Sequence, residues 1–253
     1  MKVSVRCDGI DMAGLAAAEL HGKRLDSSSK KRIVRNVKPL VWGGQDLRAQ
    51  YDKHVDGAKV NKSAKKTVLH FVFKFSDETL TDNFGKFTGD KSRRQNEMLR
   101  QARHFIQSTH GGNAVFAARV DRDEAGETIV DVFATPIYEK RTKKTKADEP
   151  GETWLSATKF GKDLARKHQD EIKRRHPESK SDSDLTAPRM VGIALNSEFR
   201  KYFQKVNEVT LDAKKEKAEG ANDRLGIERY KELKDLEAEL NQSHLRLERI
   251  RDR

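Results

Sequence analysis

A chain of 253 residues can bury one sizeable core with a helical appendage, but it is too short for two large domains. Its 52 lysines and arginines outnumber its 40 aspartates and glutamates, and the net charge of +12 attracts polyanions such as DNA, RNA and acidic membrane surfaces. No apolar run approaches the roughly 20 residues of a bilayer span, and the first residues lack the apolar stretch of a signal peptide. We therefore expect a cytoplasmic protein with no membrane span, and its single cysteine excludes an internal disulfide.

The first part of the chain alternates between strand and helix patterns. Residues Lys2 to Arg6 alternate in polarity, which predicts a short strand, and Asp11 then caps an alanine-rich helix that runs to about Arg24. A second short helix is expected at Gln45 to Val55. Lys65 to Phe75 gives the clearest strand pattern, because its large apolar residues share one face. These are Leu69, Phe71, Phe73 and Phe75.

The middle of the chain predicts a helix followed by a β-hairpin. From Lys91 to Ser108 the apolar residues recur at helical spacing. Ala114 to Arg122 and Thr128 to Tyr138 have strand patterns and are joined by a short turn, in which Gly126 tolerates a positive φ. The order of elements predicts an α+β fold, in which a largely antiparallel sheet of about four or five strands has helices packed on one face. A helical extension is expected to follow it.

The last part of the chain combines a charged connector with helices. Residues Glu139 to Glu152 form the connector, and its basic side chains suit the phosphates of nucleic acid. They are Lys140, Arg141, Lys143, Lys144 and Lys146. We predict a domain at residues 1–176, a linker at 177–188 and a helical extension at 189–253. In the final helix an apolar seam of coiled-coil spacing could pair with a second copy to make a homodimer; its residues are Leu233, Leu236, Leu240, Leu247 and Ile250.

Acidic residues gather at the predicted hairpin. Asp121 and Glu124 lie at its tip with Asp123, and Asp131 lies on the return strand among apolar neighbours. An ionised carboxylate on an apolar face is costly unless a cation or a donor compensates it. Asp121, Glu124 and Asp131 could together hold Mg²⁺ or Mn²⁺. Alternatively, Arg119 pairs with Asp131 or Asp121 and the acids at the tip are solvated, and the pattern alone favours this second interpretation.

A histidine and an arginine lie near the end of the first predicted helix. His21 and Arg24 are three residues apart, so they share one face, where the arginine could hold a phosphate beside the imidazole. The alternative is that His21 is a surface residue whose cation is favoured at a helix C-terminus.

These segments, taken in order, resemble the plasmid mobilisation/recombination (Mob/Pre, or MobV) relaxases, a branch of the HUH single-strand DNA endonucleases. That family carries a His-x-x-Arg motif on its first helix and a hairpin of the form His-x-Asp-Glu-x-x-Pro-His-x-His. The resemblance covers about residues 1 to 175. The matching stretches are Leu20–Arg24, His104–Phe105, Gly111–Val115, Asp121–Glu124, Thr135–Ile137, Leu155–Ser156 and His168–Asp170.

This chain departs from the family at the metal-binding histidines. Asp121 stands in the first position, and Ile129 and Asp131 stand in the other two when the count runs back from Pro136. Glu124 alone keeps its ligand type. The resemblance therefore implies either a site built from carboxylates or the loss of metal binding.

The resemblance also implies a reaction and its alternatives. His21 would attack a phosphorus of single-stranded or hairpin plasmid DNA at an origin of transfer, and Arg24 nearby would favour the neutral imidazole that attack requires. The metal would stabilise charge on the phosphate oxygens, and Trp42 could stack on bases. The alternative on the same fold is a non-catalytic DNA-binding protein that acts in plasmid replication, in copy control or as an accessory to nicking. A third hypothesis for the function is a helical scaffold or an RNA-binding protein.

Overall fold

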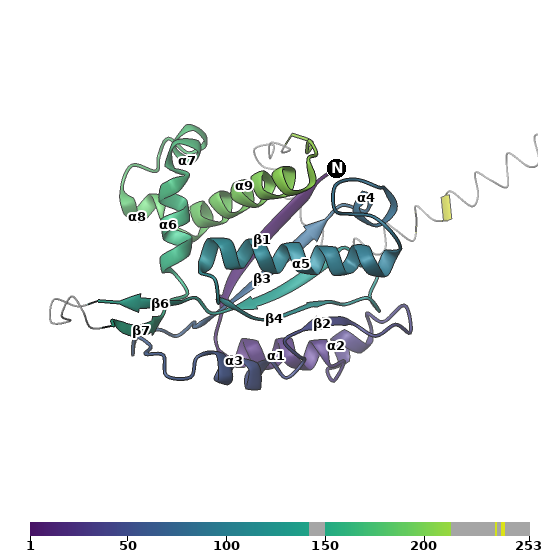
Figure 1. The fold of residues 1–253 in the computed structure, drawn as a ribbon, viewed down its shortest axis with the longest axis horizontal. Coiled ribbons are helices and arrows are strands. Elements are labelled where there is room, and N and C mark those ends of the chain that lie inside the picture. Colours follow the sequence, from purple (N-terminus) through teal and green to yellow (C-terminus); the bar gives the residue numbers. More distant parts are fainter. Residues whose placement is uncertain (142–149, 214–235, 237–238, 241–253) are drawn as a thin grey trace, which may run out of the picture. The chain divides into compact units, whose positions relative to one another are not determined.

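The computed structural model describes residues 1–141 and 150–213, together with Leu236, Glu239 and Leu240 (Figure 1). Met1–Asp212 forms one compact unit, and Ala213–Arg253 forms a second. Most of the second unit, including the greater part of the predicted coiled-coil helix, lies outside the described residues. None of the described helices is long and apolar enough to cross a membrane.

A five-stranded antiparallel sheet forms the centre of the first unit. Its strands, in the order β1-β3-β5-β4-β2, are antiparallel to every neighbour. They are β1 (Val3–Ile10), β2 (Leu40–Trp42), β3 (Val68–Phe75), β4 (Val115–Val120) and β5 (Ile129–Ala134). The predicted α+β fold with a largely antiparallel sheet is therefore confirmed. A separate pair, β6 (Ile137–Lys140) and β7 (Glu152–Leu155), extends from the end of β5. Pro136 lies between β5 and β6, and because it has no N–H it interrupts the single strand that the sequence predicted there.

The helices come before, between and after these strands. They are α1 (Met12–Gly22), α2 (Ser27–Lys30), α3 (Leu47–His54), α4 (Glu78–Thr81), α5 (Lys91–His110), α6 (Lys159–Lys167), α7 (Gln169–Arg175), α8 (Asp182–Leu185) and α9 (Pro188–Asn207). Asp11 caps α1 as predicted, since its side chain accepts a hydrogen bond from the Gly14 N–H at 2.8 Å. Asp90 caps α5 in the same way, through the Arg93 N–H.

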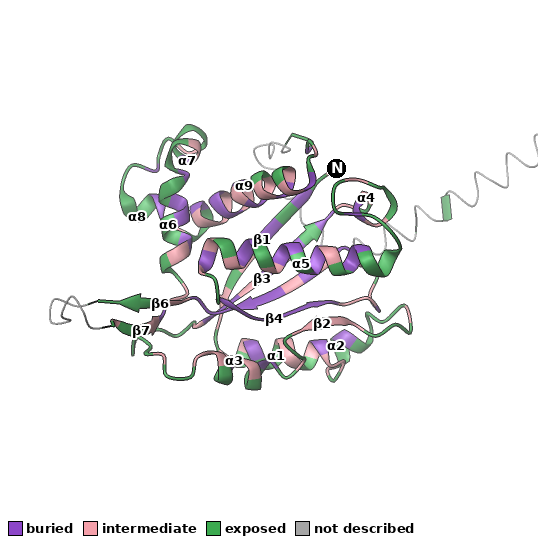
Figure 2. Cartoon of the chain, in the orientation of Figure 1, coloured by how far each residue is buried: buried purple, intermediate pink, exposed green. Residues whose placement is uncertain are grey.

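Helices α5 and α9 cover one face of the sheet, where the largest apolar cluster lies (Figures 1 and 2). The rings of Phe73 and Phe199 are 4.8 Å apart, and Phe105 lies within 5.1 Å of Phe199. The sequence predicted helices on this one face only. In the structure α1 and α3 also pack on part of the other face, because the alternation along the strands directs Phe116 and Phe133 to that side.

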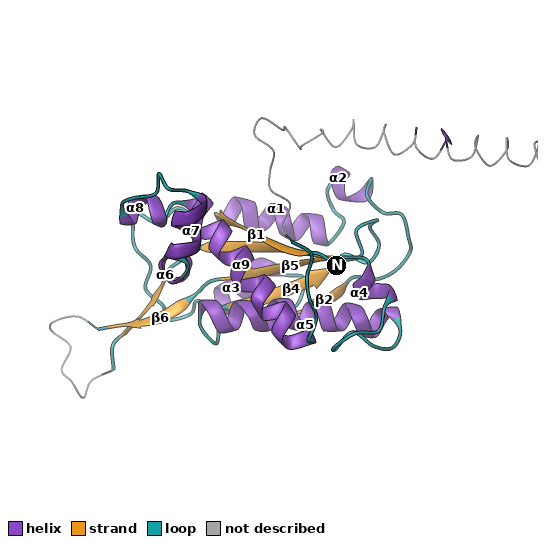
Figure 3. Cartoon of the chain, turned by 90° about the horizontal axis from the view of Figure 1, so that it is seen from above, coloured by secondary structure: helices purple, strands orange, loops and turns teal. Residues whose placement is uncertain are grey.

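Helix α9 belongs to the compact unit, although the sequence grouped it with the extension. Phe199 and Phe203 are fully buried, and Asn196 exchanges hydrogen bonds with the backbone of Val5 on β1. Helix α8 lies within residues 177–188, which the sequence assigned to a linker. The core thus continues to Asp212, because α9 packs over β1 (Figure 3) and covers the apolar face of β1 and β3 that would otherwise meet water.

Candidate functional site

The C-terminus of α1 directs an arginine toward the β4–β5 turn. The Leu25 N–H donates to the Leu20 carbonyl at 2.9 Å and the Arg24 N–H to the His21 carbonyl at 3.1 Å, the pattern of a Schellman cap. Arg24 occupies the left-handed position of that cap with φ 59°, where glycine is usual. This conformation costs about 1–2 kcal/mol for a residue with a side chain. Its cost indicates that the contacts of the Arg24 side chain hold it there.

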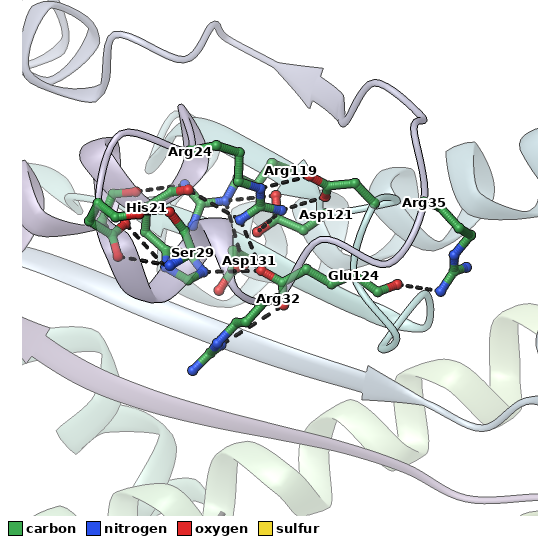
Figure 4. Close-up of polar contacts among 12 residues, drawn as sticks. His21, Arg24, Ser29, Arg32, Arg35, Arg119, Asp121, Glu124 and Asp131 are labelled. Atoms are coloured by element: carbon green, nitrogen blue, oxygen red, sulfur yellow. Dashed lines mark hydrogen bonds and ion pairs between the residues drawn. The ribbon is translucent and has the colours of Figure 1, made fainter.

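Arg24 binds the acidic residues of the turn (Figure 4). Its Nε donates to an oxygen of Asp123 at 2.7 Å and its second terminal nitrogen to the other oxygen, so the pair is bidentate. Its first terminal nitrogen donates to Glu124 Oε1 at 2.9 Å, and Asp121 Oδ2 lies 3.5 Å from the guanidinium. The hydrogen bond from Arg24 lowers the pKa of Asp123, and the contact with Asp123 raises the pKa of Arg24.

His21 lies against the same turn. Its Nε2 is 3.2 Å from Glu124 Oε1, and its Nδ1 is 3.7 Å from Asp26 Oδ2. Asp26 is held in place because it caps α2, accepting from the Ser29 N–H at 2.8 Å. The His21 side chain is 24% exposed, so a ligand can reach it. The structure thus brings His21 and Arg24 together with Asp121 and Glu124, as the resemblance implied.

A second layer of charge lies beneath these residues. Arg119 Nε is 3.3 Å from Asp121 Oδ1 and 3.7 Å from Asp131 Oδ2, so the structure shows both of the pairings considered for it. Its guanidinium also donates to the Ala18 carbonyl at 2.8 Å, close against Gly22, where a side chain would overlap it. Burial raises the pKa of Asp121 against the pull of Arg119.

Asp131 has a partner that the sequence did not indicate. His70 on β3 hydrogen-bonds Asp131 Oδ1 through Nε2 at 2.6 Å and stacks on Phe133 with centroids 4.6 Å apart. Burial alone would raise the pKa of Asp131, but the His70 hydrogen bond and the Arg119 charge lower it. The strand alternation placed His70 opposite the phenylalanine face, yet only the pairing of β3 with β5 shows which residue it meets.

These groups surround a cavity of about 250 Å³. Its lining combines both histidines with basic and acidic side chains and with Ile129 from the start of β5. Arg32, whose side chain is 47% exposed, lies 3.9 Å from Glu124 Oε2 at the edge of the site. The cavity is therefore partly open, and the charged groups of its lining can bind an anion or a cation.

His21 and two carboxylates of the cavity lie close enough together to share a metal ion. One atom each from His21, Asp121 and Glu124 lies within 4.8 Å of the others. Asp131 is not in this group, because His70 and Arg119 hold it. Asp121 Oδ1 is buried without a hydrogen-bond partner, and carboxylate oxygens are ligands that suit Mg²⁺ or Mn²⁺. These donors fit a hard divalent cation, although Arg24 already supplies positive charge to Glu124.

Comparisons with known proteins give a fold and no family. No protein-family model matches the chain, and no curated protein matches it. Among solved structures, a Mn-bound crystal structure of the MobM relaxase domain (MOBV; Mob_Pre) bound to plasmid pMV158 oriT DNA has a TM-score of 0.53 at 12% identity, covering 92% of this chain and 98% of that chain. The chain has the relaxase fold. A second structure of that domain has a TM-score of 0.45 at 15% identity, with 68% and 87% covered.

The described ends of the basic connector lie beyond the C-terminal end of β5, whereas the cavity of this relaxase fold is lined by residues near the start of β5. Of the five residues predicted to bind nucleic acid, Lys140 and Arg141 are described, whereas Lys143, Lys144 and Lys146 lie outside the described residues. Lys140 Nζ lies 4.5 Å from the ring centroid of Trp154, and Arg141 donates to Glu139 at 2.9 Å. Trp42, which the sequence offered as a surface for stacking bases, has the guanidinium of Arg103 over its ring at 3.7 Å.

Proposed function

We propose that this chain binds single-stranded or hairpin DNA at a plasmid origin of transfer and nicks and rejoins the strand at His21. The contact between His21 and Glu124 across 103 residues of chain carries the proposal, because it joins the His-x-x-Arg helix to the acidic turn. The relaxase fold and the net charge of +12 support a DNA partner. The MobM domain with this fold was bound to oriT DNA.

The arrangement of His21 supports nucleophilic attack. A carboxylate only accepts hydrogen bonds, so we assign the imidazole proton to Nε2, where it is donated to Glu124. Nδ1 then keeps the lone pair, and at 3.7 Å its neighbour Asp26 is too far for a hydrogen bond. Attack would form a bond between Nδ1 and phosphorus and break the bond to the 3′ oxygen, which takes a proton from solvent. The products are a 5′-phosphohistidine adduct and a 3′-hydroxyl, and reversal rejoins the strand.

The surrounding side chains would orient the strand. Arg32 is exposed at the edge of the cavity and can meet a phosphate oxygen. Arg24 keeps Asp123 and Glu124 in place and so positions the acceptor of the His21 proton. Asp121 and Glu124 would hold Mg²⁺ or Mn²⁺, which commonly binds through one or two carboxylates and a substrate phosphate. When bound, the cation would polarise the scissile phosphate.

One observation favours a second function on the same fold. Arg24 already pairs with Glu124 and Arg119 with Asp121 in the cavity, and Ile129 offers no ligand atom. A DNA-binding protein that does not cut, acting in plasmid replication, copy control or as an accessory to nicking, would keep this stable arrangement.

A nicking assay separates the two functions. The purified chain would be incubated with supercoiled DNA from its own gene neighbourhood in Mn²⁺ or Mg²⁺, beside His21→Ala and the control His104→Ala, an exposed histidine on α5. We expect nicked circles with protein bound at the 5′ end for the parent and the control, and none for His21→Ala. Equal nicking by His21→Ala would refute the assigned nucleophile. Binding that weakens steeply with salt, without nicking by the parent chain, would leave the non-catalytic function.

A further inference from the structure

A second basic surface lies at the β6–β7 pair. We call it the Trp154 groove; its volume is about 590 Å³ and its lining is Lys59, Val60, Asn61, Lys62, Lys140 and Trp154. Two backbone hydrogen bonds fix the loop before β3 beside β7, from the Lys59 N–H to the Thr153 carbonyl at 2.8 Å and from the Leu155 N–H to the Lys59 carbonyl at 2.9 Å. The groove is therefore built by segments that lie far apart in the sequence.

The charges of the groove favour a polyanion. Lys59 pairs with Glu152 at 2.6 Å, and Glu152 also accepts from Trp154 Nε1 at 3.0 Å, which fixes the indole. Lys62 is exposed and pairs with no acid among the described residues. Lys140 is the cross-strand partner of Glu152, and its Nζ lies over the indole face at 4.5 Å from the ring centroid. Three lysines thus face one carboxylate around a held aromatic ring.

We propose that the Trp154 groove binds a single-stranded segment of DNA, with a base stacked on the indole and phosphates at Lys62 and Lys140. A base is a neutral π surface that can replace the Lys140 ammonium on the ring, and the ammonium then meets the adjoining phosphate. The other tryptophan of the chain, Trp42, is packed against the main apolar core, and the Arg103 guanidinium lies 3.7 Å from its ring centroid. This inference rests on the proposed function, since it extends the contact of the same strand.

The Trp154 groove and the cavity are lined by different parts of the chain, which β5 and β6 connect. Asp131 lines the cavity and Lys140 lines the groove, and the intervening chain follows β5 and β6. At about 3.3 Å per extended residue, the nine steps between them span at most about 30 Å. In Figure 1 the β6–β7 pair accordingly extends beyond the sheet. The groove would hold a part of the DNA strand other than the reacting phosphate. It would therefore affect the affinity for DNA and not the nicking step at His21.

Tryptophan fluorescence provides a direct test. In Trp42→Phe, Trp154 is the remaining tryptophan, and we expect oligothymidine to quench its emission. Trp154→Ala should bind labelled oligothymidine about 5- to 150-fold more weakly, whereas Trp154→Phe should keep most of the affinity, because stacking contributes about 1–3 kcal/mol per base. Lys62→Ala should lower the salt slope of single-strand binding by about 0.7, and Lys173→Ala, an exposed lysine of α7, should leave the affinity unchanged.

The outcomes are distinct from those of the nicking assay. Absence of quenching, or parent-like affinity of Trp154→Ala, would overturn the groove even if His21 nicks DNA. Quenching with the expected losses would support the groove even if the chain does not cut. Tighter binding of oligouridine than of oligothymidine would overturn the assignment to DNA.

Discussion

Replacing Arg24 by alanine removes the cation that three carboxylates share. The Arg24 side chain is 14% exposed, and those of Asp121, Asp123 and Glu124 are 12%, 9% and 18% exposed. Removing one member of a buried ion pair typically costs about 3–5 kcal/mol, because the remaining charge stays unpaired. The pair is partly exposed and the cavity beside it is partly open, so we expect the lower end, about 3 kcal/mol. For a unit of this size that lowers the Tm by about 6–12 °C.

Two further variants separate charge from backbone conformation. Alanine keeps the strained φ of 59°, whereas glycine adopts it freely. Arg24→Gly should therefore be more stable than Arg24→Ala by about 1 kcal/mol. Arg48→Ala is the control, since Arg48 pairs with Asp52 at 3.0 Å on the exposed side of α3, and its effect should stay within about 0.5 kcal/mol.

Added Mn²⁺ tests whether the carboxylates can accept a metal in place of the guanidinium. Ligand binding stabilises the folded state by RT ln(1 + [L]/Kd), so a cation held by the vacated carboxylates should raise the Tm of Arg24→Ala more than that of the parent chain. Thermal unfolding followed by circular dichroism, with and without Mn²⁺, measures both effects. A loss below about 1 kcal/mol for Arg24→Ala, together with no extra response to Mn²⁺, would refute the reasoning.

Further predictions concern the core and the two buried aspartates. Phe199→Ala should lower the free energy of unfolding, measured in urea, by about 3–5 kcal/mol. Leu25→Ala, at a side chain that is 59% exposed, should lower it by about 0.5 kcal/mol or less. A similarly small loss for Phe199→Ala would contradict the place of Phe199 in the core. Burial raises the pKa of Asp121, so its stabilising effect is complete below the unfolded pKa near 3.9 and is lost as pH rises through the folded pKa. Asp121→Asn should therefore be more stable than the parent at neutral pH without metal, and this advantage should shrink as pH falls through the folded pKa of Asp121. Despite burial, His70 and Arg119 lower the pKa of Asp131, so its contribution is present above about 3.9 and is lost as pH falls through the folded value. Asp131→Asn should accordingly be less stable than the parent at neutral pH, and a Tm series across pH that gave both aspartates the same sign would exclude these environments.

Patterns within short segments predicted most of the secondary structure. The alternation of Leu69, Phe71 and Phe73 predicted β3, and helical spacing predicted α5, because each pattern reports a face that its own segment must bury. The predicted helix from Thr158 divides into α6 and α7 at His168, whose Nε2 is 2.7 Å from Glu198 on α9. The local pattern is continuous across His168 and did not predict this break or the contact with α9.

The residues of the candidate site could be predicted from the sequence, but their contacts with distant segments could not. Its acids and His21 stood out as residue types at motif spacing, but the partners of Arg119 and Asp131 stayed open until β4, β5 and β3 were paired. His70 was recognised only as a residue on the second face of its strand.

The sequence by itself determined where the chain alternates with strand period, where it forms helices, and that its surplus charge is positive. The tertiary structure alone decided that Arg24 meets Asp123 across 99 residues and that His70 meets Asp131 across 61. Such contacts follow from the strand order β1-β3-β5-β4-β2, which depends on how all the apolar faces of the unit pack at once. No single segment carries that information.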